Sequence, residues 1–421
     1  MRAMKDSGIA WIGEIPEEWK IVRNKNAFVC NKELVGEKSA LTQLLSLTTR
    51  GIKKKDINNA EGKLPESFDT YQFVRENDIV MCLFDLDCSA VFSGISPIDG
   101  MISPAYRVLS CKECIEPRYA DYWFRYISDG RKFNHFAKNI RYTLSYEEFS
   151  ALPLLLPKKV EQRRIADYLD RKCSQIDTII ARQQEVIEKL KAYKLSVITE
   201  AVTKGLNPHV PMKDSGVEWI GEIPEHWKLA KLKKYCHPQT GITPSTSNAE
   251  WFDGEVQWFT PGDFNGNYHL VKSKRTLSTK ALESSVAVVV PANTVMIICI
   301  GATAGKVGLA DVECSFNQQI TALLTNSLNP KFLMYWMIAN TKFIRETALF
   351  TTLPILNNQT IGDYLLLFPA NEDEEKQIVD FLDEKCNKID STITARENVI
   401  NKLSEYKKSL IYEVVTGKKE V

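Results

Sequence analysis

The chain contains two near-copies of one long stretch, residues 161–205 (EQRRIADYLDRKCSQIDTIIARQQEVIEKLKAYKLSVITEAVTKG) and residues 374–417 (EEKQIVDFLDEKCNKIDSTITARENVINKLSEYKKSLIYEVVTG). With a shift of 213 residues, positions 165–203 match positions 378–416 at 20 of 39 places. An internal repeat of this strength must be interpreted before any single motif, because each copy is one structural unit of the fold.

Each copy predicts one long amphipathic helix. Apolar residues recur at three- and four-residue steps, with Tyr193 and Tyr406 in the stripe, while charged residues fill the other face. Gly205 and Gly417 stand where C-terminal caps belong. Asn371 and Glu374 predict a capping box at the start of the second helix. About 43 residues at ~1.5 Å per residue would give a rod of roughly 65 Å.

An apolar stripe of this length needs a partner, and the other copy is the obvious one. One globular stretch precedes the first helix and the other lies between the two helices, so paired helices would run antiparallel with a domain at each end. We therefore predict an antiparallel coiled coil with an approximate two-fold relation between the halves. The predicted seam residues are Ile176, Ile180, Ile187, Leu190, Ile389, Ile393, Ile400 and Leu403.

A second repeat precedes each globular stretch. Residues 4–20 (MKDSGIAWIGEIPEEWK) return as residues 212–228 (MKDSGVEWIGEIPEHWK), identical at 14 of 17 positions. We interpret this segment as an extended strap that seats a globular domain on a helix end through buried aromatic rings. The alternative is that its rings stack on nucleic acid. The rings in question are Trp11, Trp19, Trp219 and Trp227.

The stretches between strap and helix predict two globular domains of the α/β (α+β) class. In the first, strands are expected at residues 78–84, 90–95 and 105–109, followed by a helix over 117–137. In the second, strands are expected at residues 286–290, 294–300, 306–310 and 319–325, followed by a helix from Pro330. The predicted boundaries are 1–157 and 207–369 for the domains, and 158–206 and 370–421 for the helices.

The composition excludes several classes of protein. The chain has 54 Lys and Arg against 53 Asp and Glu, a net charge of +1 and 44% hydrophobic residues. It is therefore neither a disordered chain nor a strongly basic DNA-coating protein. We expect a cytoplasmic protein with reduced thiols, because no signal peptide opens the chain and no apolar run is long enough to span a bilayer. The single CxxC at Cys111 and Cys114 is weak support for a metal site.

No motif predicts catalysis. Residues 301–307 (GATAGKV) have the wrong glycine spacing for a phosphate loop, and a tight β-turn is the better interpretation. Residues 207–210 (NPHV) lack the second Pro and the aromatic of an amino-methyltransferase motif. Glu61 and Lys63 have the spacing of a nuclease pair, but no Pro-Asp dipeptide accompanies them. We therefore predict no catalytic residue and no metal ligand.

Basic clusters are the positive signal for function. The segment 131–141 carries four cations and no acid, with aromatic residues between them, and a second cluster surrounds residue 53. In the second domain, residues 228–280 hold eight Lys or Arg against four acids. Clusters in both domains favour contact with phosphates. The predicted DNA-binding residues are Arg50, Lys53, Lys54, Lys55, Arg131, Lys132, Lys138, Arg141, Thr243, Ser245, Lys272, Lys274 and Arg275.

These motifs together resemble the specificity subunit of type I restriction-modification systems. The resemblance rests on the doubled strap (residues 11–19 and 219–227) and on the start of each long helix (161–177 and 375–390). It also rests on residues 240–264 (TGITPSTSNAEWFDGEVQWFTPGDF) and 301–320 (GATAGKVGLADVECSFNQQI). It covers nearly the whole chain in family order.

The resemblance implies a non-catalytic reader of double-stranded DNA. Each domain would read one half of a bipartite, asymmetric target, and the helices would set the spacing and help to dock two methyltransferase subunits. ATP-dependent restriction subunits would join that core, and no membrane would be involved. This chain would bind no cofactor, since S-adenosylmethionine, ATP and magnesium would belong to the partner subunits. The alternative is a structural adaptor with two protein-binding domains on a coiled-coil spacer.

Overall fold

The chain forms two compact units in the computed structural model. Unit 1 comprises Met1–Gln184 and Glu397–Val421, and unit 2 comprises Glu185–Arg396. The structure describes residues 2–49, 51–56, 65–86, 92–129, 132, 143–266, 268–325, 327–347, 349–350 and 354–421.

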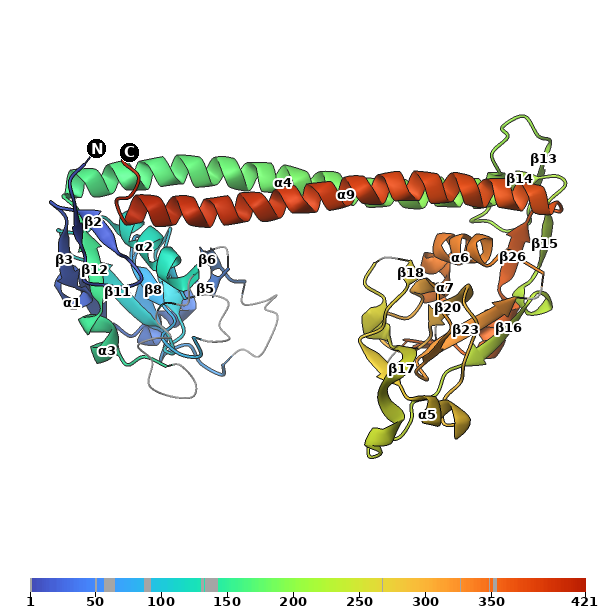
Figure 1. The fold of residues 1–421 in the computed structure, drawn as a ribbon. Coiled ribbons are helices and arrows are strands. Elements are labelled where there is room, and N and C mark those ends of the chain that lie inside the picture. Colours follow the sequence, from blue (N-terminus) through green and yellow to red (C-terminus); the bar gives the residue numbers. More distant parts are fainter. Residues whose placement is uncertain are drawn as a thin grey trace. The chain divides into compact units, whose positions relative to one another are not determined.

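Unit 1 is built on a four-stranded antiparallel sheet in the order β4 (Phe28–Asn31), β11 (Arg107–Cys111), β8 (Ile79–Met81) and β9 (Ser93–Ile95). Helix α2 (Pro117–Asp129) lies beside this sheet (Figure 1). The buried core that they share includes Trp123 and Phe124 of the helix and Phe28 and Leu109 of the sheet. Four strand pairs accompany this sheet: β1 (Met4–Asp6) with β2 (Glu14–Pro16), β3 (Lys20–Arg23) with β12 (Pro153–Leu156), β5 (Leu45–Thr48) with β6 (Gly51–Lys54), and β7 (Gln72–Val74) with β10 (Gly100–Ile102). The short helices of unit 1 are α1 (Asn24–Ala27), η1 (Gly36–Leu41) and α3 (Tyr146–Ala151).

Unit 2 contains a five-stranded sheet in the order β16 (Cys236–Thr240), β23 (Ile320–Thr325), β20 (Thr294–Ile298), β21 (Val307–Ala310) and β18 (His269–Leu270). A three-stranded sheet holds β19 (Arg275–Leu277), β17 (Phe252–Phe259) and β22 (Cys314–Phe316). The remaining strands form the pairs β13 (Met212–Asp214) with β14 (Glu222–Pro224), β15 (Lys228–Lys231) with β26 (Leu365–Phe368), and β24 (Leu349–Phe350) with β25 (Pro354–Ile355). The short helices of unit 2 are η3 (Leu232–Lys234), η4 (Ala249–Trp251), η5 (Pro261–Asp263), α5 (Thr279–Glu283), α6 (Pro330–Ala339), α7 (Thr341–Glu346) and α8 (Asn358–Asp363).

The two units share one plan. The order β4-β11-β8-β9 of unit 1 returns in unit 2 as β16-β23-β20-β21, and each sheet is followed by a helix that begins with Pro, at Pro117 and at Pro330. The predicted mixed α/β content with long helices is therefore confirmed.

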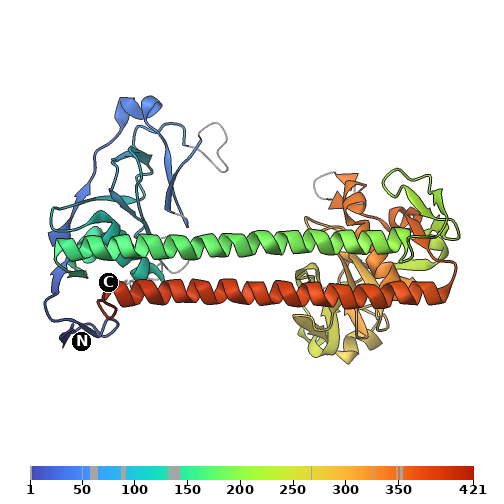
Figure 2. The ribbon, with the colours of Figure 1, turned by 90° about the horizontal axis from the view of Figure 1, so that it is seen from above.

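Two long helices supply one segment each to both units: α4 (Lys159–Lys204) with 46 residues and α9 (Glu372–Val415) with 44. In each unit the two segments lie side by side (Figure 2) and run antiparallel. In unit 1, Asp177 pairs with Lys407, and Arg164 donates to the carbonyl oxygen of Val421. In unit 2, Lys194 of α4 pairs with Asp390 of α9.

The helix ends follow the sequence closely, with one exception. Gly205 and Gly417 take φ of +74° and +72° just after the helices, which is the left-handed conformation of a C-terminal cap. At the start of α9, the side chain of Asn371 accepts a hydrogen bond from the amide of Asp373. The predicted capping box is wrong, because Glu374 turns away to bind Trp227.

The predicted seam residues are buried or partly buried, but the predicted apolar stripe also included two tyrosines that are exposed. Ile176, Ile187, Ile389 and Ile393 are buried, and the other four predicted seam residues are partly buried. Tyr193 and Tyr406, by contrast, are 57% and 52% exposed.

Two predictions for the sheets have clear outcomes. Residues 286–290 form no strand: only Val290 makes a single bridge, to Cys314, after the turn that ends α5. The turn predicted at residues 301–305 is present between β20 and β21, with φ of +102° at Gly301 and +87° at Gly305. Of the predicted strand 90–95 and helix 117–137, residues 90–91, 130–131 and 133–137 lie outside the described residues.

Candidate nucleic-acid interface and its supports

Each strap is fixed to its long helix by a buried tryptophan. Trp19 Nε1 donates to Glu161 Oε2 at 3.1 Å, and Trp227 Nε1 donates to Glu374 Oε1 at 3.0 Å. Both rings are 1% exposed. The structural interpretation of the strap is therefore correct for these two rings, because a buried ring cannot stack on a base.

The other two strap tryptophans differ between the units. Trp11 is partly buried against Trp123 and Tyr126, and the Tyr126 hydroxyl donates to its carbonyl oxygen. Trp219 is 39% exposed and packs on Trp336 and Phe343. The two straps are nearly identical in sequence, but their first tryptophans differ in exposure and in the rings they contact.

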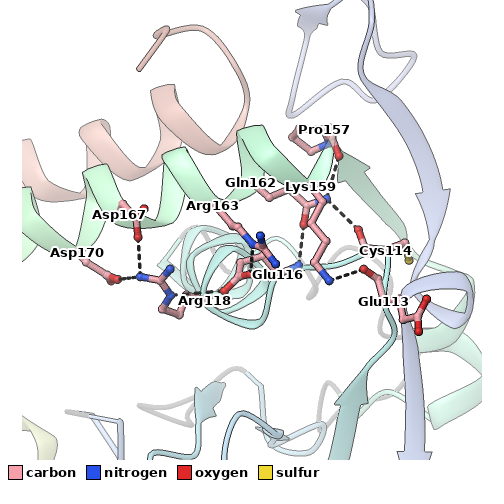
Figure 3. Close-up of polar contacts among 10 residues, drawn as sticks. All are labelled: Glu113, Cys114, Glu116, Arg118, Pro157, Lys159, Gln162, Arg163, Asp167 and Asp170. Carbon is pink, nitrogen blue, oxygen red and sulfur yellow. Dashed lines mark hydrogen bonds and ion pairs between the residues drawn. The ribbon is translucent and has the colours of Figure 1, made fainter.

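A carboxylate on each long helix holds the helix that follows the sheet. In unit 1, Asp170 accepts from Arg118 Nη1 at 2.7 Å and from the Tyr122 hydroxyl at 2.8 Å, as Figure 3 shows for the arginine. In unit 2, Asp383 accepts from Lys331 Nζ at 2.6 Å and from the Tyr335 hydroxyl at 2.7 Å. Burial, and then the hydrogen bond to the aspartate, raises the pKa of both tyrosines. Side-chain hydrogen bonds thus fix α2 to α4 and α6 to α9.

A second polar joint holds the loop before that helix. Gln162 Oε1 accepts from the amide of Glu116 at 2.7 Å, and its Nε2 donates to the carbonyl oxygens of Cys114 and Pro157 (Figure 3). At the matching position of unit 2, Glu375 Oε1 accepts from the amide of Asn329 at 2.9 Å. Burial raises the pKa of Glu375, because desolvation disfavours the charged carboxylate more than the Asn329 hydrogen bond favours it.

Sequence reasoning missed these joints, although a signal for them was present. Asp170 matches Asp383, Tyr122 matches Tyr335 and Glu161 matches Glu374 at the shift of 213. Polar residues that stay identical in both copies of an amphipathic helix are candidates for fixed contacts.

The predicted DNA contacts of unit 1 are only partly described. Lys53 and Lys54 are exposed on β6, and Lys55 follows them partly buried. Lys132 Nζ lies 4.2 Å from the centre of the Tyr126 ring, and burial lowers the pKa of this lysine. Arg50, Arg131, Lys138 and Arg141 lie outside the described residues.

In unit 2 the structure separates three neighbouring cations that the sequence grouped together. All three, Lys272, Lys274 and Arg275, are exposed. Lys274 Nζ donates to the carbonyl oxygen of Gly262 at 2.9 Å. The Arg275 guanidinium lies over the rings of Phe252 and Trp258, at 4.5 and 5.2 Å from their centres. Arg275 is thus held by aromatic rings.

The polar loop residues of unit 2 are held by one another. Thr243 Oγ1 donates to Gln318 Oε1, and the hydroxyls of Ser245 and Ser247 lie 2.8 Å apart. The turn at Thr260 is fixed by Asp263, whose Oδ2 accepts from the amide of Thr260 at 2.8 Å. These loops therefore present an ordered polar surface, which suits recognition of a shaped polar ligand.

No group of three or more His, Cys, Asp and Glu in the part of the chain that the structure describes could hold a metal ion. Burial raises the pKa of Cys111 to about 12, so it is not a reactive thiolate at neutral pH. Glu61 and Lys63, the pair considered for a nuclease, lie outside the described residues. No helix among the described residues is long and apolar enough to cross a membrane.

Comparison with known proteins defines the class. Residues 224–402 match the family model of the type I restriction modification DNA specificity domain. The "Putative type I restriction enzyme MjaX specificity subunit" of Methanocaldococcus jannaschii is 23% identical over 97% of this chain and 95% of that protein. The MjaIX specificity subunit of the same organism is 25% identical, but that match spans only 37% of this chain and 37% of that protein.

A solved structure supports the fold. One chain of a structure that describes complex assembly and conformational transition of the type I R-M system has a TM-score of 0.70 to this chain. The two are 14% identical, and the match covers 96% of this chain and 99% of the other. Residues 224–402 thus match the DNA specificity domain of type I restriction modification, and nearly the whole chain is similar in sequence to a type I restriction enzyme specificity subunit.

Proposed function

We propose that this chain directs a type I restriction-modification complex to a bipartite DNA sequence, each unit reading one half of it. The observation that carries the proposal is a shared frame with unlike surfaces. The sheet order and the polar joints to the long helices are the same in both units, whereas the intervening loop sequences hardly resemble each other. Equal frames with different loops suit the recognition of two different half-sites.

The chain's role in this proposal is non-catalytic. Two methyltransferase subunits would supply S-adenosylmethionine and the methyl transfer, and restriction subunits would supply ATP-driven steps. Paired docking sites support the methyltransferase part of the proposal. Tyr193 and Tyr406 are identical in the two copies and both are more than half exposed, as two equal surfaces for two equal partners would be.

The long helices would set the spacing between half-sites. Each helix is continuous and neither contains a proline or an interior glycine, so both are stiff enough to act as a spacer.

Selection from a pool of random DNA tests the proposal. The full chain, assembled with a methyltransferase partner, should enrich two short conserved sequences separated by a fixed gap of arbitrary sequence. Absence of any enriched sequence, with the complex intact, would favour the adaptor alternative.

A further inference from the structure

A groove in unit 2 combines cations with an aromatic and aliphatic floor. Its volume is about 730 Å³, and it is bordered by α4, the end of α6, α7 and the turn between β20 and β21. The floor includes Phe264, Tyr268 and Leu195, and the rim includes Lys306, Lys342 and Arg345.

The rim cations carry charge that the described part of the chain does not neutralise. Lys306, Lys342 and Arg345 are exposed, and none forms an ion pair with a described residue. Lys306 Nζ and Arg345 Nη2 each lie 3.5 Å from a backbone carbonyl oxygen, of Phe264 and of Ala302. Glu346 is the one acid among the groove's lining residues, so the three rim cations leave the groove positive, while Lys191 is paired with Glu188.

The turn at residues 301–305 is shaped to bring these cations together. Gly305 takes φ of +87°, and a Cβ added there would lie 2.7 Å from Cγ of Arg345. Only a glycine therefore lets the arginine stem cross the turn, next to Lys306. The turn whose glycine spacing excluded a nucleotide-binding loop thus lets Arg345 line the same groove as Lys306.

Tyr268 in the floor of the groove is held in place by its neighbours. The amide of Leu309 donates to the carbonyl oxygen of Tyr268 at 2.7 Å, and Lys194 Nζ lies 4.4 Å from the centre of the Tyr268 ring. Burial raises the pKa of Tyr268 to about 12, so its hydroxyl stays neutral and adds no negative charge.

The groove depends on a small side chain that the first copy lacks. Ala339 lines it, and the residue that matches Ala339 at the shift of 213 is Tyr126. The Tyr126 ring packs on Tyr412 at 5.2 Å and lies under Lys132. A larger aromatic ring thus stands in unit 1 at the repeat position that Ala339 occupies in the groove of unit 2.

We propose that this groove holds the sugar-phosphate backbone of the DNA read by unit 2, with Lys306, Lys342 and Arg345 on phosphates and the apolar floor against the sugars. This inference rests on the proposed function and adds the place of backbone contact. Exposed cations on a polyanion supply sequence-independent affinity, whereas the polar loops would supply base reading.

The test compares two matched double variants of the full chain assembled with a methyltransferase partner. Lys306→Gln with Lys342→Gln removes two rim charges, and Lys228→Gln with Lys234→Gln removes two exposed charges elsewhere in unit 2. Affinity for duplex DNA is measured by fluorescence anisotropy over a range of salt concentrations. Each lost phosphate contact lowers the salt slope by ~0.9, so the rim variant should lose about 1.8 units while the control variant keeps its slope. That loss corresponds to roughly 60-fold weaker binding at about 0.1 M salt, if both proteins bind equally at about 1 M.

Lys306→Arg with Lys342→Arg keeps the charge and should restore the slope. Provided that the wild-type assembly binds DNA, three results would overturn the groove assignment. The first is an unchanged salt slope in the rim variant, and the second is an equal loss of slope in the control variant. The third is a rim variant that loses the methyltransferase partner but not its affinity for DNA. If the wild-type assembly itself selects no DNA sequence, the proposed function fails, and that result is separate from the behaviour of the variants.

Discussion

Lys194 Nζ lies 2.6 Å from Asp390 Oδ2 across the paired helices of unit 2. At the shift of 213 these residues match Lys407 and Asp177, which form the same ion pair in unit 1 at 2.7 Å. One lysine–aspartate contact between α4 and α9 is thus made twice, with the roles of the helices exchanged. This is the relation that a two-fold repeat of antiparallel helices requires.

The two ion pairs should contribute unequally to stability. The Lys194 side chain is 8% exposed and that of Lys407 is 24% exposed. Asp390→Asn leaves a nearly buried ammonium without its carboxylate and should cost about 1–3 kcal/mol. Asp177→Asn should cost about 0.2–1 kcal/mol, as for exposed pairs. Urea unfolding of both variants, followed by circular dichroism, checks the order of the midpoints; equal midpoints would show that burial of the lysine does not set the strength of the pair.

Glu375 should make the stability of the chain depend on pH. Burial raises its pKa above 4.5 in the folded state, so the folded protein favours the protonated form. This contribution is present below pH ~4.5 and is lost as the pH rises through the folded pKa. Glu375→Gln should therefore unfold at a higher temperature than the wild type at pH 8, with the difference shrinking toward pH 4.

The copy in unit 1 supports this prediction, because Gln162 accepts the matching amide hydrogen bond without a charge. Thermal unfolding at several pH values measures the effect. A variant less stable than the wild type at pH 8 would mean that the carboxylate charge itself stabilises the joint.

Lengthening the helices should lengthen the gap in the DNA target. Four residues inserted after Gln184 in α4 and four after Arg396 in α9 fall at the boundaries of the units. They add ~6 Å and ~40° to each helix. One base-pair step advances ~3.4 Å and turns ~34°. The preferred gap should therefore grow by one or two base pairs with both half-site sequences unchanged, since coiled coils absorb a four-residue stutter.

Selection from targets with randomised gap length measures this shift. Retained binding with the original gap would show that the helices do not measure the DNA.

The sequence predicted the frame of the molecule because the frame is repeated. The helix ends at Gly205 and Gly417, the turn at 301–305 and the clip role of Trp19 and Trp227 all follow from local chemistry that occurs twice or has a strong backbone preference. Val286–Val290 misled because a run of apolar β-branched residues also suits an irregular buried segment. Tertiary context decides between the two.

The candidate interface was harder to predict. Lys272 and Arg275 are both exposed, and charge in the sequence does not show that the Arg275 guanidinium lies on aromatic rings. Nor does the sequence show that Arg345 crosses the turn at Gly305, since that close approach depends on the absence of a side chain on this left-handed glycine. Contacts of this kind arise from folding over long range, and no local pattern encodes them.

The central claim is that the two units read separate halves of the target, and exchange of one unit's loops tests it most directly. Residues 229–365 would be replaced by the matching stretch of a specificity subunit with a different known target, with the straps and long helices kept. Sequencing of the DNA selected by the assembled complex should show one half-site changed, the other half-site retained and the gap unaltered. A change in both half-sites, or in neither, would contradict the account.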